Sequence, residues 1–504
     1  MNPQRKWLVF LAVGMMILLV NLDATIVNLA LANIAKAFGV GMTEIQWVIT
    51  SYLLVTAVSF CIFGRLADML GKRRVYILGV VFFIAASLLA GLAPNVEMLI
   101  LARFIQGLGF AATLGLSLIL IVQAFPEQQR GFAMGAAITI TGVAQAAGPI
   151  VGGVILELAS WRWIFLLNVP LGLLSIIMTL KIVPRDEITR ESSMDFFGAA
   201  LFIAGFSFIL VSVNQYTVLG KYYFILCCVI GGCLLSLFVV KSLKTKHPLI
   251  DLRLLKNQQY LNIVNIRMLF MFASSGLLFI IPLYLQNVLA MSPLRTGSLL
   301  LFMTAVIAVA SPLIGKMVDF VSYKWPILIS MITAVISCFI LTQVSVSTQQ
   351  NTLIAGLMLF GLAFGANIPA TAAGVLVQAP KEAVGVAIGL FFTIGISGAM
   401  LGVAISSTIM DLHSQALLRQ FLAVQHVSIN PEQLKILSQA ANGSQSQLAL
   451  VKGLNSDLRI LPMKEALAYS FLGAFHLIFY MMMSLSLLGV VLSCLLFRIN
   501  KKPG

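Results

Sequence analysis

The chain has 504 residues, of which 60% are hydrophobic and only 10% are charged, and its mean hydropathy is +1.02. A soluble globular domain carries more charge, and apolar runs of about 20 residues, long enough to cross a bilayer, recur along the whole chain. The net charge of +15 does not indicate a nucleic-acid partner, because lysine and arginine are distributed between the apolar runs. The composition predicts a polytopic protein of the lipid bilayer.

The first apolar run, from Trp7 to about Ala30, is too long for the core of a cleaved signal peptide, so we expect it to remain as a membrane span. Turn residues and charges separate it from the runs that follow. We predict fourteen spans, at 7–30, 44–64, 74–93, 97–122, 131–157, 161–181, 196–213, 222–240, 264–288, 295–315, 324–344, 351–378, 383–409 and 468–497.

Basic residues indicate which face of the membrane each connection occupies. The N-terminus, the even-numbered connections and the C-terminus hold most of the 32 lysines and arginines, including the run 72–74. The short connections on the other face hold only Lys36, Arg162, Lys221 and Arg295. Because basic connections are retained in the cytoplasm, we expect both termini to be cytoplasmic.

Two charges lie inside apolar runs. Asp23 is in LLVNLDATIVNLAL of the first span, and Arg103 is in LARFIQGLG of the fourth, on one helical face with Gln106. A lone arginine in a span costs about 2.5–3.5 kcal/mol on insertion scales, so it should face protein or water. Counted from the span ends, Asp23 and Arg103 both lie roughly 10 Å below the outer boundary. They could form a functional site or a structural ion pair between two helices.

A short signature occurs twice. FGRLADMLGKRRV, from Phe63 to Val75, joins the second and third spans, and IGKMVDF, from Ile314 to Phe320, joins the tenth and eleventh. Both read apolar, Gly, basic, apolar, apolar, Asp, although the second copy has Ser322 in place of Gly71. A repeat on one membrane side suggests two parallel six-span halves.

The repeat implies three regions: a first six-helix bundle at 1–190, an inserted helix pair with cytoplasmic linkers at 191–258, and a second bundle at 259–504. The second bundle contains a long polar outer segment at 410–467. Within it, LHSQALLRQFLAV (412–424) is amphipathic and is predicted to be helical. The segment could cap the outer mouth or form a docking surface for a partner.

Several motifs in this order resemble one family: LDATIVNLAL, GRLADMLGKRR, LARFIQGLG, GVAQAAGPIVGG and WRWIFLLNVPLG. Together they resemble the fourteen-span drug:proton antiporters of the major facilitator superfamily, the EmrB/QacA type, over nearly the whole chain and most densely over 20–175. The resemblance implies an all-α major facilitator fold of two pseudo-symmetric six-helix bundles plus two inserted helices. It also implies a proton-coupled exporter of amphiphilic, cationic small molecules in the bacterial cytoplasmic (inner) membrane. The energy source would be the proton gradient, without a cofactor, and some relatives work with a periplasmic adaptor and an outer-membrane channel.

The loop signature supplies a candidate gating motif, made up of Gly64, Arg65, Asp68, Gly71, Arg73 and Arg74. The glycines allow a tight turn. Asp68 can accept hydrogen bonds from Arg65, from the Arg73–Arg74 pair or from a neighbouring helix end. By itself this could be a solvated turn. The resemblance implies a charge latch between the halves, made in the outward-open state and broken in the inward-open state.

The fifth span contains Gly148, Pro149, Gly152 and Gly153, a small-residue pattern that lets a neighbouring helix approach closely. Ordinary helix packing explains the pattern. The resemblance identifies it as the antiporter motif of exporters, and the outward direction of transport is inferred from that resemblance.

Asp23 is the candidate carboxylate shared by proton and substrate. Burial disfavours its charged form and a nearby Arg103 favours it, so opening to alternate faces would change the balance. A cationic substrate would then compete with a proton for one site. Trp47, Tyr52 and Gln106 are cavity candidates, and His476 could relay protons or be a hydrogen-bonded core histidine.

The alternative transporter is a dedicated exporter of one endogenous metabolite or siderophore. The remote alternative is an integral-membrane enzyme or a sensor. The four histidines are scattered, neither a metal-ligand spacing nor a GxxxxGK[ST] phosphate loop occurs, and the termini are short, so we expect no enzyme and no metal. The spans of the second half contain no obvious carboxylate and one arginine, Arg267, which argues against divalent cations as substrates.

Overall fold

The structure is a computed structural model that describes residues 3–40, 42–184, 194–245, 248–250, 253–345, 350–380, 383–424 and 460–498. Within these ranges the regular structure is entirely helical, which confirms the predicted all-α class. Thirteen helices in the described ranges are long and apolar enough to cross a membrane. A further long helix, α6 (Arg130–Leu158), matches the predicted fifth span but is not among the thirteen. The count of fourteen spans therefore stays a prediction.

The first half is built from six long helical segments joined by short turns. Gly71 has φ 96°, a left-handed conformation that lets α3 end and α4 begin without a gap. The Asn95 side chain accepts a hydrogen bond from the Met98 amide and caps α5. The helices are α1 (Pro3–Phe38), α2 (Met42–Ile45), α3 (Trp47–Leu70), α4 (Lys72–Gly91), α5 (Val96–Ala124), the 3₁₀ turn η1 (Glu127–Gln129), α6, α7 (Arg162–Leu166) and α8 (Asn168–Ile182).

The second half follows the same plan. Asn257 caps the first long helix by accepting from two backbone amides, and Ser292 caps the second. A single π-helical turn, η2, extends the first helix. The elements are α11 (Arg253–Lys256), α12 (Gln258–Leu283), η2 (Tyr284–Val288), α13 (Pro293–Phe320), α14 (Lys324–Thr342), α15 (Gln350–Gln378), α16 (Val384–Val424) and α19 (Ile460–Arg498).

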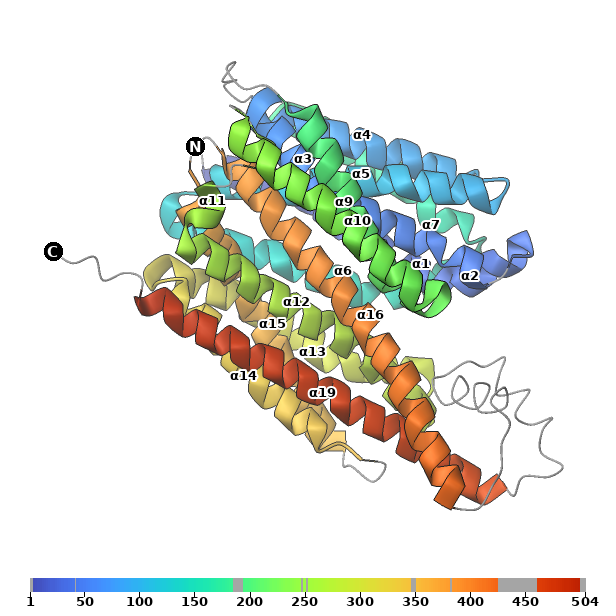
Figure 1. Ribbon diagram of the computed structural model, residues 1–504. Helices are drawn as coiled ribbons and strands as arrows, with labels where there is room; N and C mark the ends of the chain where they lie inside the picture. The colour runs from blue at the N-terminus through green and yellow to red at the C-terminus, as the bar shows by residue number, and fades with distance from the viewer. Residues whose placement is uncertain are drawn as a thin grey trace.

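Helix pairing repeats between the halves. In each half the first long helix packs on the fifth and sixth, the second on the fourth, and the third on the fourth and sixth. The halves meet along two seams: the first seam is α3 against α16, and the second seam is α6 against α13 (Figure 1). Each seam pairs the second helix of one half with the fifth helix of the other. Such pairing is what an internal two-fold relation produces.

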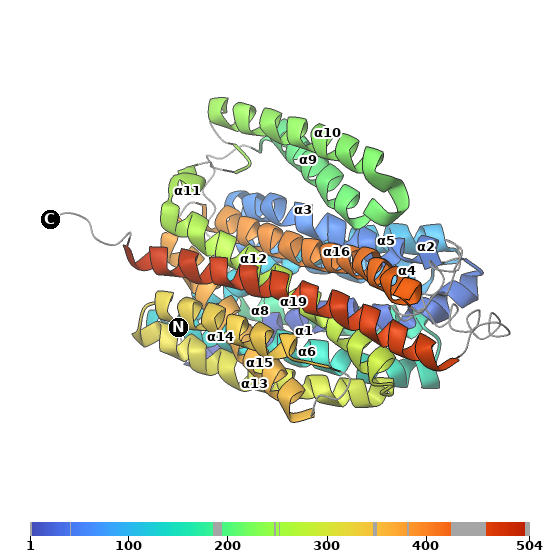
Figure 2. The same ribbon diagram turned by 60° about the horizontal axis from the view of Figure 1, so that its bottom comes forward.

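The inserted pair, α9 (Phe196–Asn214) and α10 (Tyr216–Lys244), lies outside the two halves, with α10 outermost (Figure 2). Asp195 caps α9 and forms an ion pair with Lys241 of α10. α9 packs on both α3 and α16, and Leu210 contacts Ala57 and Met400 from the two halves. The pair therefore covers the first seam.

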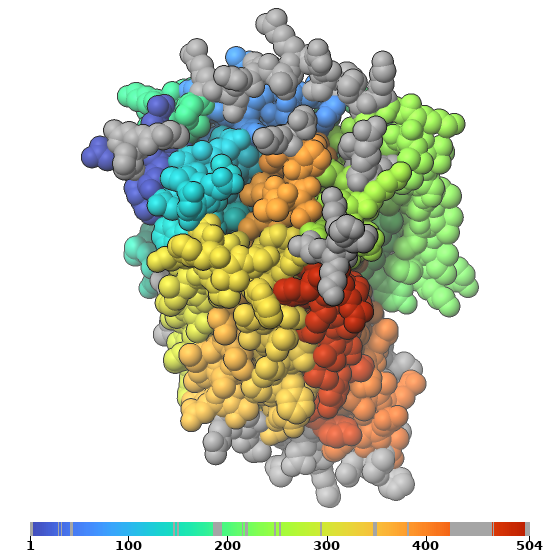
Figure 3. All heavy atoms as spheres, turned by 90° about the vertical axis from the view of Figure 1, so that its left-hand side faces the viewer, coloured from blue at the N-terminus to red at the C-terminus, as the bar shows by residue number. Residues whose placement is uncertain are grey.

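α1 begins and α19 ends at the same end of the bundle, on the left of Figure 1. α3 and α13 also end there, and α6 and α16 begin there. We call this the latch end, because the two copies of the loop signature, at 63–75 and 314–320, lie there. Figure 3 views it directly: outside the grey atoms, the blue-to-cyan first half abuts the yellow and orange second half.

The outer segment predicted at 410–467 needs a correction at both borders. α16 continues without a break to Val424, so the predicted helix at 412–424 is present but belongs to α16, and α19 already begins at Ile460. The extension persists because its apolar face packs on α19: Leu417 lies against Gly473, and the rings of Phe421 and Tyr469 are 5.9 Å apart. Residues 425–459, on which the cap and docking interpretations depend, lie outside the described residues.

Candidate functional site

Asp23 lies on α1 at the centre of a buried hydrogen-bond network. Its Oδ2 accepts from Arg103 Nη1 of α5 at 2.5 Å. Its Oδ1 accepts from Gln106 Nε2 and from Asn168 Nδ2, both at 3.0 Å. Both oxygens act only as acceptors, as those of an ionised carboxylate do. The similar depth predicted for Asp23 and Arg103, and the helical face that Arg103 shares with Gln106, agree with these contacts.

The Arg103 guanidinium is fixed from three further directions. Its Nε donates to the Val48 carbonyl of α3 at 3.1 Å, and its Nη1 donates to Gln106 Oε1 at 2.7 Å. Its Cζ lies 3.9 Å from the centre of the Tyr52 ring, a cation–π contact. The ring of Tyr52, which the sequence suggests as a cavity candidate, therefore packs against the Arg103 guanidinium of the ion pair.

Two members of the network were missed in the sequence. Ser87 Oγ of α4 accepts from Gln106 at 2.9 Å and from Asn168 at 3.4 Å. Asn168 opens α8 within WRWIFLLNVPLG, and an amide among apolar residues of a span was the available signal. The network therefore draws on α1, α3, α4, α5 and α8, all in the first half.

The network is closed to solvent in this conformation. The side chains of Arg103 and Asp23 are 1% and 0% exposed. A buried pair of this kind costs desolvation, which its extra hydrogen bonds offset. The geometry alone fits both a structural ion pair and a proton site at rest.

The remaining cavity and relay candidates lie outside the network. Trp47, the first residue of α3, is 36% exposed. His476 of α19 is half-buried, and its Nε2 lies 2.7 Å from the Val344 carbonyl, just after α14. This is the contact of a hydrogen-bonded core histidine in the second half.

Asp68 bridges the halves at the latch end of the first seam. Its two carboxylate oxygens accept from the backbone amides of Gly385 and Val386, at 2.9 and 3.0 Å. These amides are in the first turn of α16, where a helix presents free N–H groups and its positive dipole end. The sequence suggests three partners for Asp68: Arg65, the Arg73–Arg74 pair and a neighbouring helix end. The two hydrogen bonds of its carboxylate go to the third of these, the helix end.

The second copy of the signature makes the same contact at the second seam. The carboxylate of Asp319 accepts from the amides of Gly131 and Phe132, at 2.6 and 2.9 Å, in the first turn of α6. The helices touch beside each latch. A Cβ at Gly64 would lie 2.2 Å from the Gly385 carbonyl oxygen, and one at Gly315 would lie equally close to that of Gly131.

The basic members of the gating motif lie around this contact. Arg73 donates to the Leu180 carbonyl at 2.6 Å and so ties α4 to α8 within the first half. Arg65 is half-buried on α3, one turn before Asp68, and Arg74 is exposed. Gly71 makes the turn between them.

The four residues of the antiporter motif separate into different surroundings on α6. A Cβ at Gly148 would lie 2.0 Å from Thr25 Oγ1 of α1, and one at Gly152 would lie 2.9 Å from Ile26. Among the described residues, Gly153 has no neighbour within 4 Å of that position. The side chain of Pro149 lies outside the described set. Gly148 and Gly152 let α6 approach α1 directly beside Asp23.

Comparison with known proteins identifies a family. The Major Facilitator Superfamily profile matches residues 13–254 and 263–423. The chain is 31% identical over 453 residues to "Multidrug resistance protein Stp" of Mycobacterium tuberculosis, covering 89% of this chain and 83% of that protein. It is 28% identical over 408 residues to the riboflavin transporter RibZ of Clostridioides difficile, covering 80% and 88%. It is 28% identical over 397 residues to the lincomycin resistance protein LmrB of Listeria monocytogenes, covering 78% and 84%.

Solved structures share the fold at low identity. The human organic anion transporter MFSD10 superposes with a TM-score of 0.62 at 14% identity, covering 98% of this chain and 100% of that one. The proton:xylose symporter XylE gives a TM-score of 0.60, also at 14% identity, covering 93% of this chain and 100% of that one.

Proposed function

Because the chain belongs to the Major Facilitator Superfamily, we propose that it is a proton-coupled secondary active exporter of amphiphilic, cationic small molecules. Membership makes it an integral membrane transporter and not an enzyme. Relatives named for multidrug and lincomycin resistance support drug export. The motif order supports the fourteen-span drug:proton antiporter type, in a bacterial inner membrane.

The latch end is the cytoplasmic end in this proposal, because the basic connections gather there. The latches and both seams are closed at that end. At the opposite end, a separate buried cluster includes Ile26, Val48 and Phe165, and those of its members that the structure describes all belong to the first half. At the latch end the two halves are in contact, and at the opposite end the first half has a buried core of its own. This arrangement supports an outward-facing state.

The observation that carries the proposal is the environment of Asp23, whose carboxylate accepts hydrogen bonds from three donors in a site closed to solvent. A proton arriving from the outer face would neutralise Asp23 and weaken its hold on Arg103. After the halves rock, release of that proton to the cytoplasm would restore the anion for a cationic substrate. Exchange of one proton for one monovalent cation moves no net charge, so the pH gradient alone could drive it.

The test is transport in proteoliposomes with an imposed pH gradient and a lipophilic cationic dye. Asp23→Asn keeps the side-chain size and should abolish the gradient-driven component while leaving dye binding measurable. Asp195→Asn is the matched control, since it also removes a buried carboxylate from an ion pair, but in the inserted helix pair. Proton-coupled export that persists in Asp23→Asn would refute the role of Asp23, and gradient-independent dye leakage through the unmodified protein would refute coupling.

A second candidate is a dedicated exporter of one metabolite, favoured by the similarity to a riboflavin transporter. Competition of several unrelated dyes for transport separates the two, because a dedicated exporter should ignore most of them. Any periplasmic adaptor and outer-membrane channel would meet the end where α16 and α19 project together, and we include these partners only as part of the proposal.

A further inference from the structure

The second half contains a buried cation that the Asp23 site does not use. Arg267 of α12 is 4% exposed, and its Nε and Nη1 donate to no acceptor within the described part of the chain. Two of its neighbours lie on α16: the Phe391 ring, 5.0 Å from Cζ, and Gly395, where an added Cβ would lie 3.1 Å from the Arg267 Nε. It lies about 13 Å along α12 from the first residue of the helix, well inside the span.

A guanidinium has five N–H donors and stays charged, so enclosing one without a carboxylate is costly. Arg103 shows how this chain satisfies a buried arginine, with an aspartate, a carbonyl and an amide around it. Arg267 has the cation–π contact, but its Nε and Nη1 have none of those acceptors among the residues that the structure describes. The missing partner is an anion.

A continuous aromatic series leads from one arginine to the other. Phe391 contacts Phe392 at 5.3 Å, and Phe392 stacks on Phe60 of α3 at 5.1 Å with 20° between the planes. The series continues through Phe110 to Tyr52, the ring below Arg103. The buried Tyr52 hydroxyl has no hydrogen-bond partner among the described residues.

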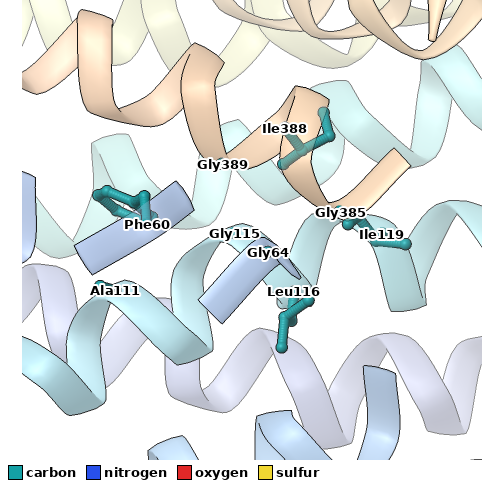
Figure 4. Close-up of a pocket in the computed structure, with 9 residues that line it drawn as sticks. All are labelled: Phe60, Gly64, Ala111, Gly115, Leu116, Ile119, Gly385, Ile388 and Gly389. Atoms are coloured by element: carbon teal, nitrogen blue, oxygen red, sulfur yellow. The ribbon is translucent and has the colours of Figure 1, made fainter. Parts of the chain in front are cut away.

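The Phe60–Phe392 stack crosses the first seam. Next to it, glycines leave a narrow pocket between α3, α5 and α16, lined by Phe60, Gly64, Gly115, Gly385 and Gly389 among others (Figure 4). When the latch end opens, α3 and α16 separate and this stack must break. The faces of both rings, together with Phe391 and Arg267 behind them, would then line a space between the halves, which is where transporters of this build hold substrates.

We propose that Arg267, Phe391 and Phe392 form an anion-recognising subsite for aromatic amphiphiles that carry a carboxylate, whose rings replace the Phe60–Phe392 stack. This rests on the proposed transport function and extends its substrate class from cations to aromatic carboxylates and zwitterions. The guanidinium supplies paired donors to the carboxylate, and the two phenylalanines supply the apolar wall.

The experiment uses two dyes that differ in one group, rhodamine B and its ethyl ester, which share the cationic ring system and differ in the free carboxylate. Binding to the purified full-length protein is followed by dye anisotropy without a pH gradient. The unmodified protein should bind the free acid more tightly, and Arg267→Met should weaken that binding by about tenfold while changing ester binding less than about twofold.

Arg267→Lys keeps the charge and should recover part of the preference for the acid. Arg295→Met is the control, because it removes an exposed arginine at the start of α13. Equal binding of both dyes by the unmodified protein, binding of neither, or an equal loss for both dyes in Arg267→Met would overturn the proposal. Because binding is measured without a gradient, failure of proton coupling cannot produce any of these results.

Discussion

At the scale of the residue, the geometry of Asp23 and Arg103 fits both of the roles that the sequence leaves open, a structural ion pair and a proton site. The pair ties α1 to α5 through hydrogen bonds closed to solvent, which is what a structural ion pair does. In the proposed mechanism it also supplies the carboxylate that takes up and releases the proton. Stability measurements and transport measurements separate the roles, because only the second depends on the pH gradient.

The first prediction concerns stability. Arg103→Met leaves Asp23 buried without its cation and should lower the free energy of unfolding by about 3–5 kcal/mol, whereas Asp23→Asn should cost less because Asn keeps an acceptor. The double variant should be more stable than Arg103→Met alone. A double-mutant cycle on thermal unfolding in detergent measures this, and strictly additive effects would show that the pair is not coupled.

Arg267 illustrates the opposite case at the same scale. Its presence in an apolar span was visible in the sequence, but the lack of an acceptor for its Nε and Nη1 within the described ranges was not. Phe391 and Phe392 had no predicted role, because aromatic residues in spans mostly pack against helices or lipid. Only their position between Arg267 and the seam suggests one.

At the scale of the helix, the antiporter motif divides into glycines that matter for packing and one that does not. Gly148 lies against Thr25 of α1, two residues beyond Asp23, and Gly153 faces open space. The sequence motif does not distinguish these two glycines, but they lie on different faces of the helix.

Gly148→Ala should therefore push α1 away from α6, cost about 1–3 kcal/mol of stability and reduce transport. Gly153→Ala is the matched control and should behave like the unmodified protein, because its methyl group meets no neighbour. Thermal unfolding and dye transport of the two variants check this. A Gly153→Ala defect as large as that of Gly148→Ala would rule out α1–α6 packing as the cause.

At the scale of the whole molecule, the two latches place one carboxylate on one helix N-terminus at each seam. Each contact is worth about 1 kcal/mol, or roughly a fivefold change in the closed population. If the halves rock as rigid bodies, weakening either latch should open both seams. The chain contains its own reporter, because Cys61 is buried in the first seam with its Sγ 3.4 Å from Thr393 Oγ1 of the opposite half.

We expect maleimide to label Cys61 faster in Asp68→Asn, faster in Asp319→Asn as well, and fastest in the double variant. The other cysteines are replaced, except Cys338, which is buried inside the second half and should stay unlabelled in every variant. Acceleration by Asp68→Asn alone would mean that the seams open independently.

The sequence by itself determined the medium, the helical class and most span positions, because a bilayer interior requires long apolar runs with internally satisfied backbones. It also placed Asp23 and Arg103 at one depth, since helix rise converts residue counts into distance. It placed the outer border of α16 too early, because hydropathy marks where the membrane ends and not where helix packing ends.

Tertiary structure decided which side chains meet. Asn168 donates to the carboxylate of Asp23, and Ser87 accepts from Asn168, because α8 and α4 turn these two residues inward. The sequence does not show in which direction a single hydroxyl or amide in a span points. The contacts of Asp68 and Asp319 with helix ends each depend on a second helix far along the chain. The same holds for Arg267, whose Nε and Nη1 find no acceptor in the part of the chain that the structure describes. Such contacts are properties of the packed pair of halves, and no single helix specifies them.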